Sequence, residues 1–256
     1  MAYKAITYEK KGRIAYVTLN RPEVANAHNG VMGRELREAW EDANKDENIW
    51  VAILTGAGDK HFCTGADMRA ATEGESGGGG WGDIPEDFWK PVILAINGVC
   101  AGGGWHFVWQ SDFAIASEHA TFLEPHVSVG WVPLREMLGA ANRMPLSAAL
   151  RMAMLGTKER MTAQRAFDLG VITEVVPQTQ LMPRATEIAG WICEQAPLAV
   201  QSIKEVLHRA YELRYAQREV FEYGNMLREF KTHHSEDYLE GPRAFVQKRK
   251  PVWKGK

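Results

Sequence analysis

Apolar and polar residues alternate at the start of the chain and then change to helical spacing. The segments ITYEK and RIAYVTLN, separated by the turn KKG, each alternate as half-buried strands do, so we predict an opening β-hairpin. A helix is predicted over residues 30–45, where Leu36, Ala39 and Trp40 fall near helical spacing. The run VAILTG that follows is short and continuously apolar, which indicates a buried strand.

The alternation of strand and helix continues through the middle of the chain. PVILAIN and DFAIAS repeat the pattern of a buried strand, and the segment after GGG begins a helix. After Pro133 the pattern is that of amphipathic helices, apart from VITEVVP, with helices predicted at 183–194 and 198–230. Pro183 then stands in the first turn of its helix, where proline is tolerated. Alternating units of this kind predict an α/β fold with a mostly parallel sheet and a helical C-terminal part.

The composition is that of a globular protein with balanced charge. Hydrophobic residues make up 45% of the 256 positions, and the 30 basic and 32 acidic residues leave a net charge of −2. Proteins that bind nucleic acid concentrate positive charge, so nucleic acid is not predicted as a partner. No stretch approaches about 18 uninterrupted apolar residues, and the first segment lacks an apolar run. We therefore predict no membrane span and no export, and the cytoplasm is the expected location.

The three cysteines, Cys63, Cys100 and Cys193, are widely spaced and form no C-x-x-C pair. This spacing is typical of reduced thiols in a core and not of disulfides or of a zinc site, so no metal is predicted.

Residues 71–88, ATEGESGGGGWGDIPEDF, contain four consecutive glycines beside serine and acidic residues. Such a composition predicts a mobile loop. The loop is either a lid over a site or a simple connector, since long irregular loops serve both purposes.

Two glycine-rich turns are the first candidates for chemistry. HFCTGADM follows the strand VAILTG, and NGVCAGGGWHF follows the strand PVILAIN and leads into a helix. Glycine lets the backbone approach a ligand closely, and the N-terminus of a helix presents free amide groups that favour negative charge. Two such turns would be able to converge on one oxygen. The turns are not nucleotide-binding loops, because the chain contains neither G-x-G-x-x-G nor G-x-x-x-x-G-K-[ST].

Six segments, in order and at suitable spacing, resemble the crotonase, or enoyl-CoA hydratase/isomerase, superfamily. They are LNRPEVANA, VAILTGAGDKHFCTGADM, INGVCAGGGW, SDFAIASEHATFLEPHVSVG, LGTKERMTAQRAFDLGVITEVVP and GPRAFVQKRKP, and together they cover almost the whole chain. The resemblance implies a spiral ββα core with an acyl-CoA site over residues 1–190. It also implies a helical C-terminal region over residues 191–256 that builds a homotrimer, commonly stacked as a dimer of trimers. Coenzyme A would enter as part of an acyl-CoA thioester substrate, with no separate cofactor.

The family's shared device is a pair of backbone amides that form an oxyanion hole for the thioester carbonyl. Matching the motifs position by position, the resemblance assigns these amides to Ala66 in TGAD and to Gly103 in AGGGW. An oxygen that gains negative charge during reaction is stabilised by preorganised amides, typically by several kcal/mol. No side chain is needed there, which explains glycine and alanine.

The resemblance also implies where coenzyme A would lie. Glu23 departs from the pattern, because relatives often carry a basic residue there and a carboxylate does not help phosphate binding. Lys248 corresponds to a C-terminal lysine that reaches coenzyme A, and Phe245 to an aromatic that supports it. The remaining substrate-binding candidates are Val24, Ala25, Ala27, Thr64, Gly65, Asp67, Met68 and Arg69, of which Arg69 would meet a phosphate.

Histidines replace both glutamates that relatives use for acid-base chemistry. These positions hold His106, after GGGW, and His126, in EPH. Imidazole titrates near neutral pH, so one ring is able to accept a proton while the other donates. We expect neutral His126 to activate water at the β-carbon and His106 to handle the α-proton, with like charges pushing the two pKa values apart. Glu124 either orients this chemistry or faces solvent.

A second departure follows His126, where relatives often carry a glycine-rich PGAGG. This chain has VPLREM, which places Leu134 and Arg135 at the site. Bulk there favours a pocket for a bulky or cyclic acyl group, with Trp131 and Leu134 as substrate contacts. The tryptophans at 81, 105, 109 and 131 either line this pocket or belong to the core and the trimer contacts.

Three functions are consistent with these residues. The first is an enoyl-CoA hydratase/isomerase-like lyase that stabilises a thioester enolate and uses histidines for proton transfer. The second is a hydrolase or retro-Claisen carbon–carbon lyase, because some relatives that cleave cyclic diketones carry a histidine in the PH position. The aspartate expected nine residues later is Arg135 here, which argues against the second. The third is a non-catalytic acyl-CoA-binding protein, supported by the loss of both glutamates.

Overall fold

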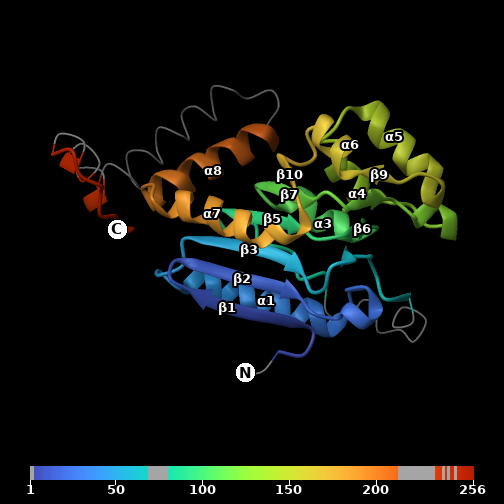
Figure 1. Ribbon diagram of the computed structural model, residues 1–256, viewed down its shortest axis with the longest axis horizontal. Helices are drawn as coiled ribbons and strands as arrows, with labels where there is room; N and C mark the ends of the chain where they lie inside the picture. The colour runs from blue at the N-terminus through green and yellow to red at the C-terminus, as the bar shows by residue number, and fades with distance from the viewer. Residues whose placement is uncertain (1–2, 69–79, 213–233, 238–239, 241–242, 245–246) are drawn as a thin grey trace.

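The main sheet of the computed structural model has six strands in the order β1-β2-β3-β5-β7-β10 (Figure 1). The structure describes residues 3–68, 80–212, 234–237, 240, 243–244 and 247–256. The predicted hairpin is formed by β1 (Ile6–Lys11) and β2 (Ile14–Leu19), which pair antiparallel. The other neighbours pair parallel: β3 (Val51–Gly56), β5 (Val92–Ile96), β7 (Phe113–Ser117) and β10 (Glu174–Val176). The predicted, mostly parallel sheet is confirmed.

Helices cover both faces of this sheet, which explains the continuously apolar strands. On β3, Ala52 and Leu54 join the hydrophobic cluster that contains Trp40 of α1 (Gly30–Lys45). Val51 and Ile53 join the opposite cluster, which contains Leu181, Ala185 and Ala189 of α7 (Leu181–Cys193). A strand buried on both faces needs apolar residues at every position.

A second sheet, with the order β4-β6-β8-β9, was not predicted from the sequence. Its strands are β4 (His61–Cys63), β6 (Val99–Ala101), β8 (Thr121–Leu123) and β9 (Met161–Thr162). Strands of two or three residues are too short to show an alternating pattern. In each of the pairs β3–β4, β5–β6 and β7–β8, the first strand belongs to the main sheet and the second strand to the second sheet. This arrangement gives the expected spiral of ββ units followed by helical turns.

The remaining helices follow the sheets. α3 (Gly104–Gln110) begins at the last glycine of GGG, one residue before the predicted start. The helices α4 (Leu134–Ala140), α5 (Leu146–Leu155) and α6 (Ala163–Asp168) gather at the end of the molecule away from the C-terminus (Figure 1). Short 3-10 turns lie at η1 (Pro22–Val24), η2 (His126–Val129), η3 (Gly156–Lys158) and η4 (Gln178–Gln180).

The C-terminal helices differ in detail from the prediction. α7 begins two residues before the expected start, so that Pro183 is its third residue and still lies in the first turn. α8 (Pro197–Glu212) starts as expected, and the rest of the predicted helix lies outside the described residues. The predicted boundary after residue 190 falls inside α7, and the division into two domains stays a prediction. None of the helices in the described ranges is long and apolar enough to cross a membrane.

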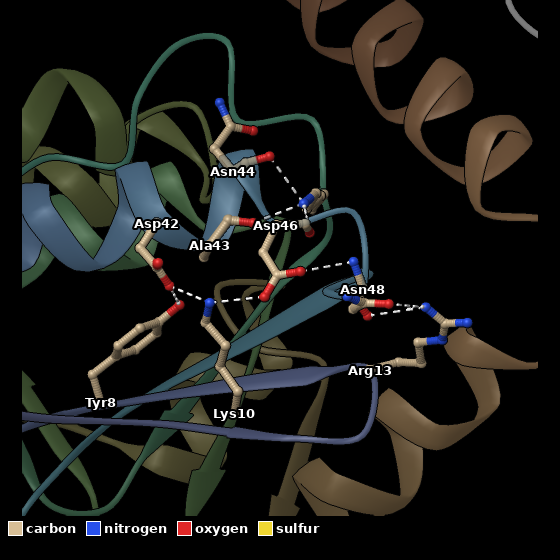
Figure 2. Close-up of polar contacts among 9 residues, drawn as sticks. Tyr8, Lys10, Arg13, Asp42, Ala43, Asn44, Asp46 and Asn48 are labelled. Atoms are coloured by element: carbon tan, nitrogen blue, oxygen red, sulfur yellow. Dashed lines mark hydrogen bonds and ion pairs between the residues drawn. The ribbon is translucent and has the colours of Figure 1, made fainter. Parts of the chain in front are cut away.

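The C-terminus of α1 is closed by a lysine from a distant part of the chain. Lys90 Nζ donates hydrogen bonds to the carbonyl oxygens of Ala43 (2.7 Å), Asn44 (3.0 Å) and Asp46 (2.7 Å). Figure 2 shows Ala43, Asn44 and Asp46 near Lys10, which pairs with Asp46 at 2.8 Å. The last carbonyls of a helix have no partner within the helix, and a cation there also opposes the negative end of the helix dipole. Burial lowers the pKa of Lys90.

α8 is fastened to the core by a second buried lysine. Lys204 Nζ donates to the carbonyl oxygens of Phe88 and Lys90, both at 2.9 Å, and pairs with Asp112 at 2.9 Å. His208 contacts the other oxygen of Asp112 at 3.0 Å. Burial raises the pKa of Asp112, but the contacts with His208 and Lys204 outweigh it and lower the pKa overall.

The three cysteines carry free thiols. Cys63 and Cys100 are fully buried, and burial raises the pKa of Cys63 to about 12 and that of Cys100 well above its ordinary value. Cys193 is half-buried, and burial raises the pKa of its thiol to about 11. Cys63 and Cys100 thus lie in the core, as predicted, and Cys193 packs against the edge of it.

The expected trimer stays a prediction. Large apolar side chains are exposed on and around η2, α4 and α5, and these are Val127, Val129, Trp131, Val132, Leu134, Leu138, Leu146, Leu150, Met154 and Leu155.

Candidate active site

The two glycine-rich turns meet at the edge of the second sheet. Gly65 has φ +92°, and a Cβ atom there would lie 3.1 Å from the backbone nitrogen of Gly103 and 3.2 Å from the carbonyl oxygen of Ala101. Gly102 has φ +51°, and a Cβ atom there would lie 3.3 Å from Cε1 of His126. Only glycine combines these backbone angles with such a close approach. The turns and His126 therefore share one small region.

Both turns leave backbone N–H groups available to a ligand. His28 N–H donates to the carbonyl oxygen of Gly65 (2.8 Å), and Asp67 N–H donates to the carbonyl oxygen of His28 (2.8 Å), so Ala66 N–H points away from this bridge. Within the described chain, neither Ala66 N–H nor Gly103 N–H donates to another protein group. Gly103 directly precedes α3, where helical N–H groups have no intrahelical partner. The arrangement suits a developing oxyanion.

His126 is paired with the carboxylate two residues before it. Nδ1 of His126 forms a short hydrogen bond with Oε1 of Glu124, and the backbone N–H of His126 donates to the same oxygen at 3.0 Å. Glu124 is fully buried, so of its two possible orientations it takes the one toward His126 and not toward solvent. The hydrogen bond to Glu124 raises the pKa of His126. Because Glu124 occupies Nδ1, the other nitrogen, Nε2, is the one available for chemistry.

His106 lies between two carboxylates. Its Nε2 is 2.9 Å from Oε1 of Glu136, and its Nδ1 is 3.6 Å from Oδ1 of Asp83, which is beyond hydrogen-bond length. Burial lowers the pKa of His106, but the two carboxylates outweigh it and raise the pKa overall. Burial raises the pKa of Glu136, and the bond to His106 outweighs it in turn, so that pKa is lowered.

Asp83 is held as a carboxylate. Burial raises its pKa, but His106, Gln110 and Arg135 lower it to about 2. Arg135 pairs with Asp83 at 3.2 Å and is itself largely exposed. His106 thus has a carboxylate near each of its two ring nitrogens.

The expected repulsion between the two rings is present, because His106 lowers the pKa of His126, but it is the smaller effect. The pKa of His106 and that of His126 are both raised. Each ring has its own carboxylate, Glu136 or Glu124, and a charge in contact outweighs a like charge farther away.

Trp81 covers the turn that contains Gly103. A Cβ atom on Gly103 would lie 2.0 Å from Cη2 of Trp81, so the indole lies directly against that glycine. The same ring system stacks on His28, with centroids 4.3 Å apart and planes at 30°, and contacts His106 at 4.8 Å. Of the predicted tryptophans, Trp81 is thus the one that covers the glycine turn.

The other tryptophans have different roles. Trp105 is fully buried in the core and donates through Nε1 to the carbonyl oxygen of Leu123 at 3.2 Å. Trp109 packs against Gly139 of α4. Trp131 is 44% exposed and lies 5.9 Å from the ring of His126, and Leu134 is 61% exposed. Trp105 thus belongs to the core, whereas the pocket that Trp131 and Leu134 were expected to line stays a prediction.

Sequence reasoning missed Glu136, Asp83 and His28. Glu136 belongs to the same VPLREM segment that departs from the family pattern, and Asp83 follows the glycine run. His28 lies in RPEVANAHNG, and the only feature of the sequence that could have marked it as a candidate is that it is a histidine. Their contacts join residues that are more than 20 positions apart in the sequence, as with His106, which lies 23 positions after Asp83 and 30 before Glu136.

The two segments predicted to hold coenzyme A lie side by side. Thr64 Oγ1 donates to the carbonyl oxygen of Ala25 at 3.1 Å. Asp67 pairs with Arg21 at 2.9 Å, and Arg21 also donates to the carbonyl oxygen of Ala27 at 2.6 Å. These contacts join the segment 24–27 to the segment 64–68.

The remaining binding candidates are more dispersed. Val24 is half-buried and Met68 is 48% exposed. Lys248 is exposed in a turn with φ +52°. Arg69 and Phe245 lie outside the described residues. No cluster of three or more histidine, cysteine, aspartate or glutamate side chains suited to a metal ion occurs in the described ranges.

Comparison with known proteins identifies the family. The sequence model of the enoyl-CoA hydratase/isomerase family matches residues 9–256. The carnitinyl-CoA dehydratase of Proteus mirabilis (strain HI4320) is 39% identical, over 96% of this chain and 97% of the relative. The structure of an enoyl-CoA hydratase/isomerase from Mycobacterium paratuberculosis superposes with a TM-score of 0.91 and 41% identity, covering 99% of each chain. The carnitinyl-CoA hydratase from Mycobacterium avium superposes with a TM-score of 0.75 and 35% identity, covering 98% of this chain and 99% of the other. The α/β fold, the ordered motifs and these similarities together show that this chain belongs to the enoyl-CoA hydratase/isomerase family of the crotonase superfamily.

Proposed function

We propose that this enzyme catalyses the reversible addition of water to a 2,3-enoyl-CoA thioester, using two histidine–carboxylate pairs for proton transfer. The observation that carries the proposal is the placement of His126–Glu124 and His106–Glu136 around the turns that contain Ala66 and Gly103. Acyl-CoA processing of the hydratase/dehydratase kind is what the family does.

The carbonyl oxygen of the thioester would accept hydrogen bonds from Ala66 N–H and Gly103 N–H. Removal or addition of the α-proton turns the thioester into an enolate or back, and the enolate oxygen carries most of the negative charge. Two N–H groups held by rigid turns stabilise that charge without reorganisation. Gly65 keeps the two turns close enough for both to reach one oxygen.

His126 would exchange a proton with the β-oxygen through Nε2. In the hydration direction, neutral Nε2 takes a proton from water while the water oxygen bonds to the β-carbon. In the dehydration direction, Nε2–H gives that proton to the hydroxyl while the carbon–oxygen bond breaks, which releases water. Glu124 raises the pKa of His126 and so favours its charged ring, which is the form needed in dehydration. The carboxylates beside His106 favour its charged ring as well, which is the form needed in hydration, so the two shifts select neither direction.

His106 would exchange the α-proton. Glu136 accepts at Nε2, which leaves Nδ1 available, and Nδ1 has no hydrogen-bond partner among the residues that the structure describes. In hydration the charged ring gives this proton to the α-carbon of the enolate, and in dehydration the neutral ring removes it. Trp81 contacts both His106 and Gly103, so the acyl chain has to share this space with the indole.

Two assays test the proposal. Crotonyl-CoA loses its conjugated absorbance on hydration, and exchange of the α-protons of butyryl-CoA in deuterated water reports acid-base competence with a simpler ester. We expect His126→Ala to lower the hydration rate by about 100-fold or more, the usual contribution of a general acid-base residue. His119→Ala is the control, because His119 is largely exposed and pairs only with the neighbouring Glu118 at 3.7 Å. Wild-type protein that binds these esters without exchange or hydration would refute the proposal.

Hydrolysis of the acyl group is a second candidate. The supporting observation is the pair His126–Glu124, since a carboxylate-oriented imidazole is also able to activate water for attack on a carbonyl carbon. The sequence argument against it was that Arg135 replaces an aspartate. Arg135 is turned outward to Asp83, but the next residue, Glu136, is buried and supplies a carboxylate to the region. Release of free coenzyme A thiol or of a ring-opened acid, without hydration products, would favour this candidate.

A purely binding role has less support than the sequence alone suggested. Its argument was the loss of both catalytic glutamates. Glu124 and Glu136 place carboxylates in contact with both replacing histidines, at positions two and thirty residues away from them. Affinity for acyl-CoA in calorimetry, with every ester unchanged in mass spectrometry, would be the result expected of a binding protein.

A further inference from the structure

His28 is held rigidly next to the oxyanion turn. Its backbone N–H donates to the carbonyl oxygen of Gly65, and its carbonyl oxygen accepts from Asp67 N–H, each at 2.8 Å. The side chain is nearly buried, with 6% of the residue exposed, and its ring stacks on Trp81. Trp81 in turn lies against Gly103, so His28, the indole and the second oxyanion amide form one continuous wall.

The ring of His28 is neutral and has an unused nitrogen. Burial lowers the pKa of His28 to about 4, and a contact with the backbone of Trp81 offsets only part of this effect. Within the described residues, the buried Nε2 has no hydrogen-bond partner that meets normal geometry. Buried polar atoms are almost always hydrogen-bonded, and those that are not call for a ligand, a water or a catalytic reason.

Unsatisfied polar atoms are concentrated in this region. In the described part of the chain, six buried side-chain nitrogen or oxygen atoms lack a hydrogen bond. Four of them belong to His28, Asp83, His106 and Glu124, all of which surround Trp81, Gly103 or His126. The proposed chemistry uses Nδ1 of His106, and it uses Glu124 only through the oxygen bonded to His126. It has no use for Nε2 of His28.

We propose that His28 determines specificity by hydrogen-bonding, through Nε2, an oxygen carried by the acyl group, so that the site prefers oxygenated acyl thioesters to hydrocarbon chains of the same size. This oxygen is distinct from the thioester oxygen held by the two amides. A hydroxyl group pairs with either tautomer of a neutral imidazole, because it both donates and accepts, whereas a keto group pairs only with the N–H form. The inference rests on the proposed function for the class of substrate, an acyl-CoA.

Matched esters test this preference by direct binding. Isothermal calorimetry on the full chain would compare butyryl-CoA with 4-hydroxybutyryl-CoA and acetoacetyl-CoA, and cyclohexanecarbonyl-CoA with its hydroxylated and keto derivatives. We expect wild-type protein to bind at least one oxygenated ester about fivefold or more tighter than its hydrocarbon match, the ratio that one buried hydrogen bond supplies. Comparing the hydroxylated esters with the keto esters shows which kind of oxygen pairs with His28. Equal affinity within every pair would overturn the proposal.

Variants at position 28 assign the preference to this residue. His28→Leu removes the polar group and should abolish the preference, while His28→Gln keeps a hydrogen-bonding group near the place of Nε2 and should retain part of it. His119→Leu is the matched control on the surface and should leave the preference unchanged. A preference that persists undiminished in His28→Leu would assign the oxygen to another residue and sink the proposal.

A measurement on wild-type protein covers the case in which His28→Leu fails to fold. In protein with ¹⁵N-labelled histidine, the Nε2 resonance that disappears in His28→Gln should shift on adding the preferred oxygenated ester and stay in place with its hydrocarbon match. An unshifted resonance would contradict the proposal. Exchange of α-protons in the same samples tests the proposed function separately, because binding preference does not require turnover. A binding preference without α-proton exchange would refute the proposed function and support the role of His28. Exchange without a binding preference would support the proposed function and refute the role of His28.

Discussion

Replacing Glu136 with glutamine removes one charge from a buried ion pair and keeps the shape of the side chain. The pair joins Oε1 of Glu136 to Nε2 of His106 at 2.9 Å, with side-chain exposures of 10% and 2%. Solvent therefore screens the pair little. A hydrogen bond between charged groups typically contributes about 1.5–3 kcal/mol, so we expect Glu136→Gln to lower the free energy of unfolding by about 2 kcal/mol near pH 6.

The size of this loss should depend on pH. The pKa of His106 is raised above its ordinary value of 6.5, so its contribution is complete below pH 6.5 and is lost as the pH rises through the higher folded pKa. The pKa of Glu136 is lowered below its ordinary value of 4.5, so its contribution is present above pH 4.5 and is lost as the pH falls through the lower folded pKa. The pair stabilises the fold most between these two ordinary values.

Urea unfolding of wild type and Glu136→Gln, followed by tryptophan fluorescence at one protein concentration, measures the effect. The difference in unfolding free energy should be largest at about pH 5–6.5 and shrink as the pH rises through the raised folded pKa of His106. Glu118→Gln is the matched control, because Glu118 faces His119 on the surface with side-chain exposures of 52% and 72%. Its effect should stay within about 0.5 kcal/mol at every pH. A Glu136→Gln difference that is constant or grows toward alkaline pH would refute the assignment of a charged His106.

Three further outcomes are expected. Lys90→Met should lower the free energy of unfolding, measured by urea titration, by about 3 kcal/mol, because it leaves three carbonyl oxygens at the end of α1 without their donor. The control Lys45→Met, at an exposed position of the same helix, should change this free energy by less than about 0.5 kcal/mol. Gly65→Ala should reduce α-proton exchange by about 100-fold, because the new Cβ atom would lie 3.1 and 3.2 Å from backbone atoms. The control Gly12→Ala has φ +60° and open space around it, so it should lower the free energy of unfolding by about 1 kcal/mol and leave exchange intact. The two fully buried cysteines should react with a thiol reagent only after unfolding, since burial keeps their thiols protonated and covered; rapid labelling of native protein would contradict this.

Much of the fold follows from local patterns. The hairpin β1–β2 and the helix α1 were predicted because alternation or helical spacing is repeated over six to sixteen residues, and β3 because its six residues form a continuous, largely apolar run. The second sheet was missed, since β4, β6 and β8 have three residues each and β9 has two, too few for any period to appear. Pairing with neighbouring strands, and not sequence periodicity, defines these elements.

The sequence by itself determined the family, the two glycine turns and the replacement of both glutamates by histidines, because residue type at motif positions is written in the chain. Only the tertiary structure decided how those histidines are charged. Glu136 reaches His106 from α4, and Trp81 and Asp83 reach it from the segment that precedes β5. The pKa of an imidazole depends on the charges and burial within a few ångströms of its ring, and such neighbours come from chain segments whose distance in sequence carries no information about their distance in space.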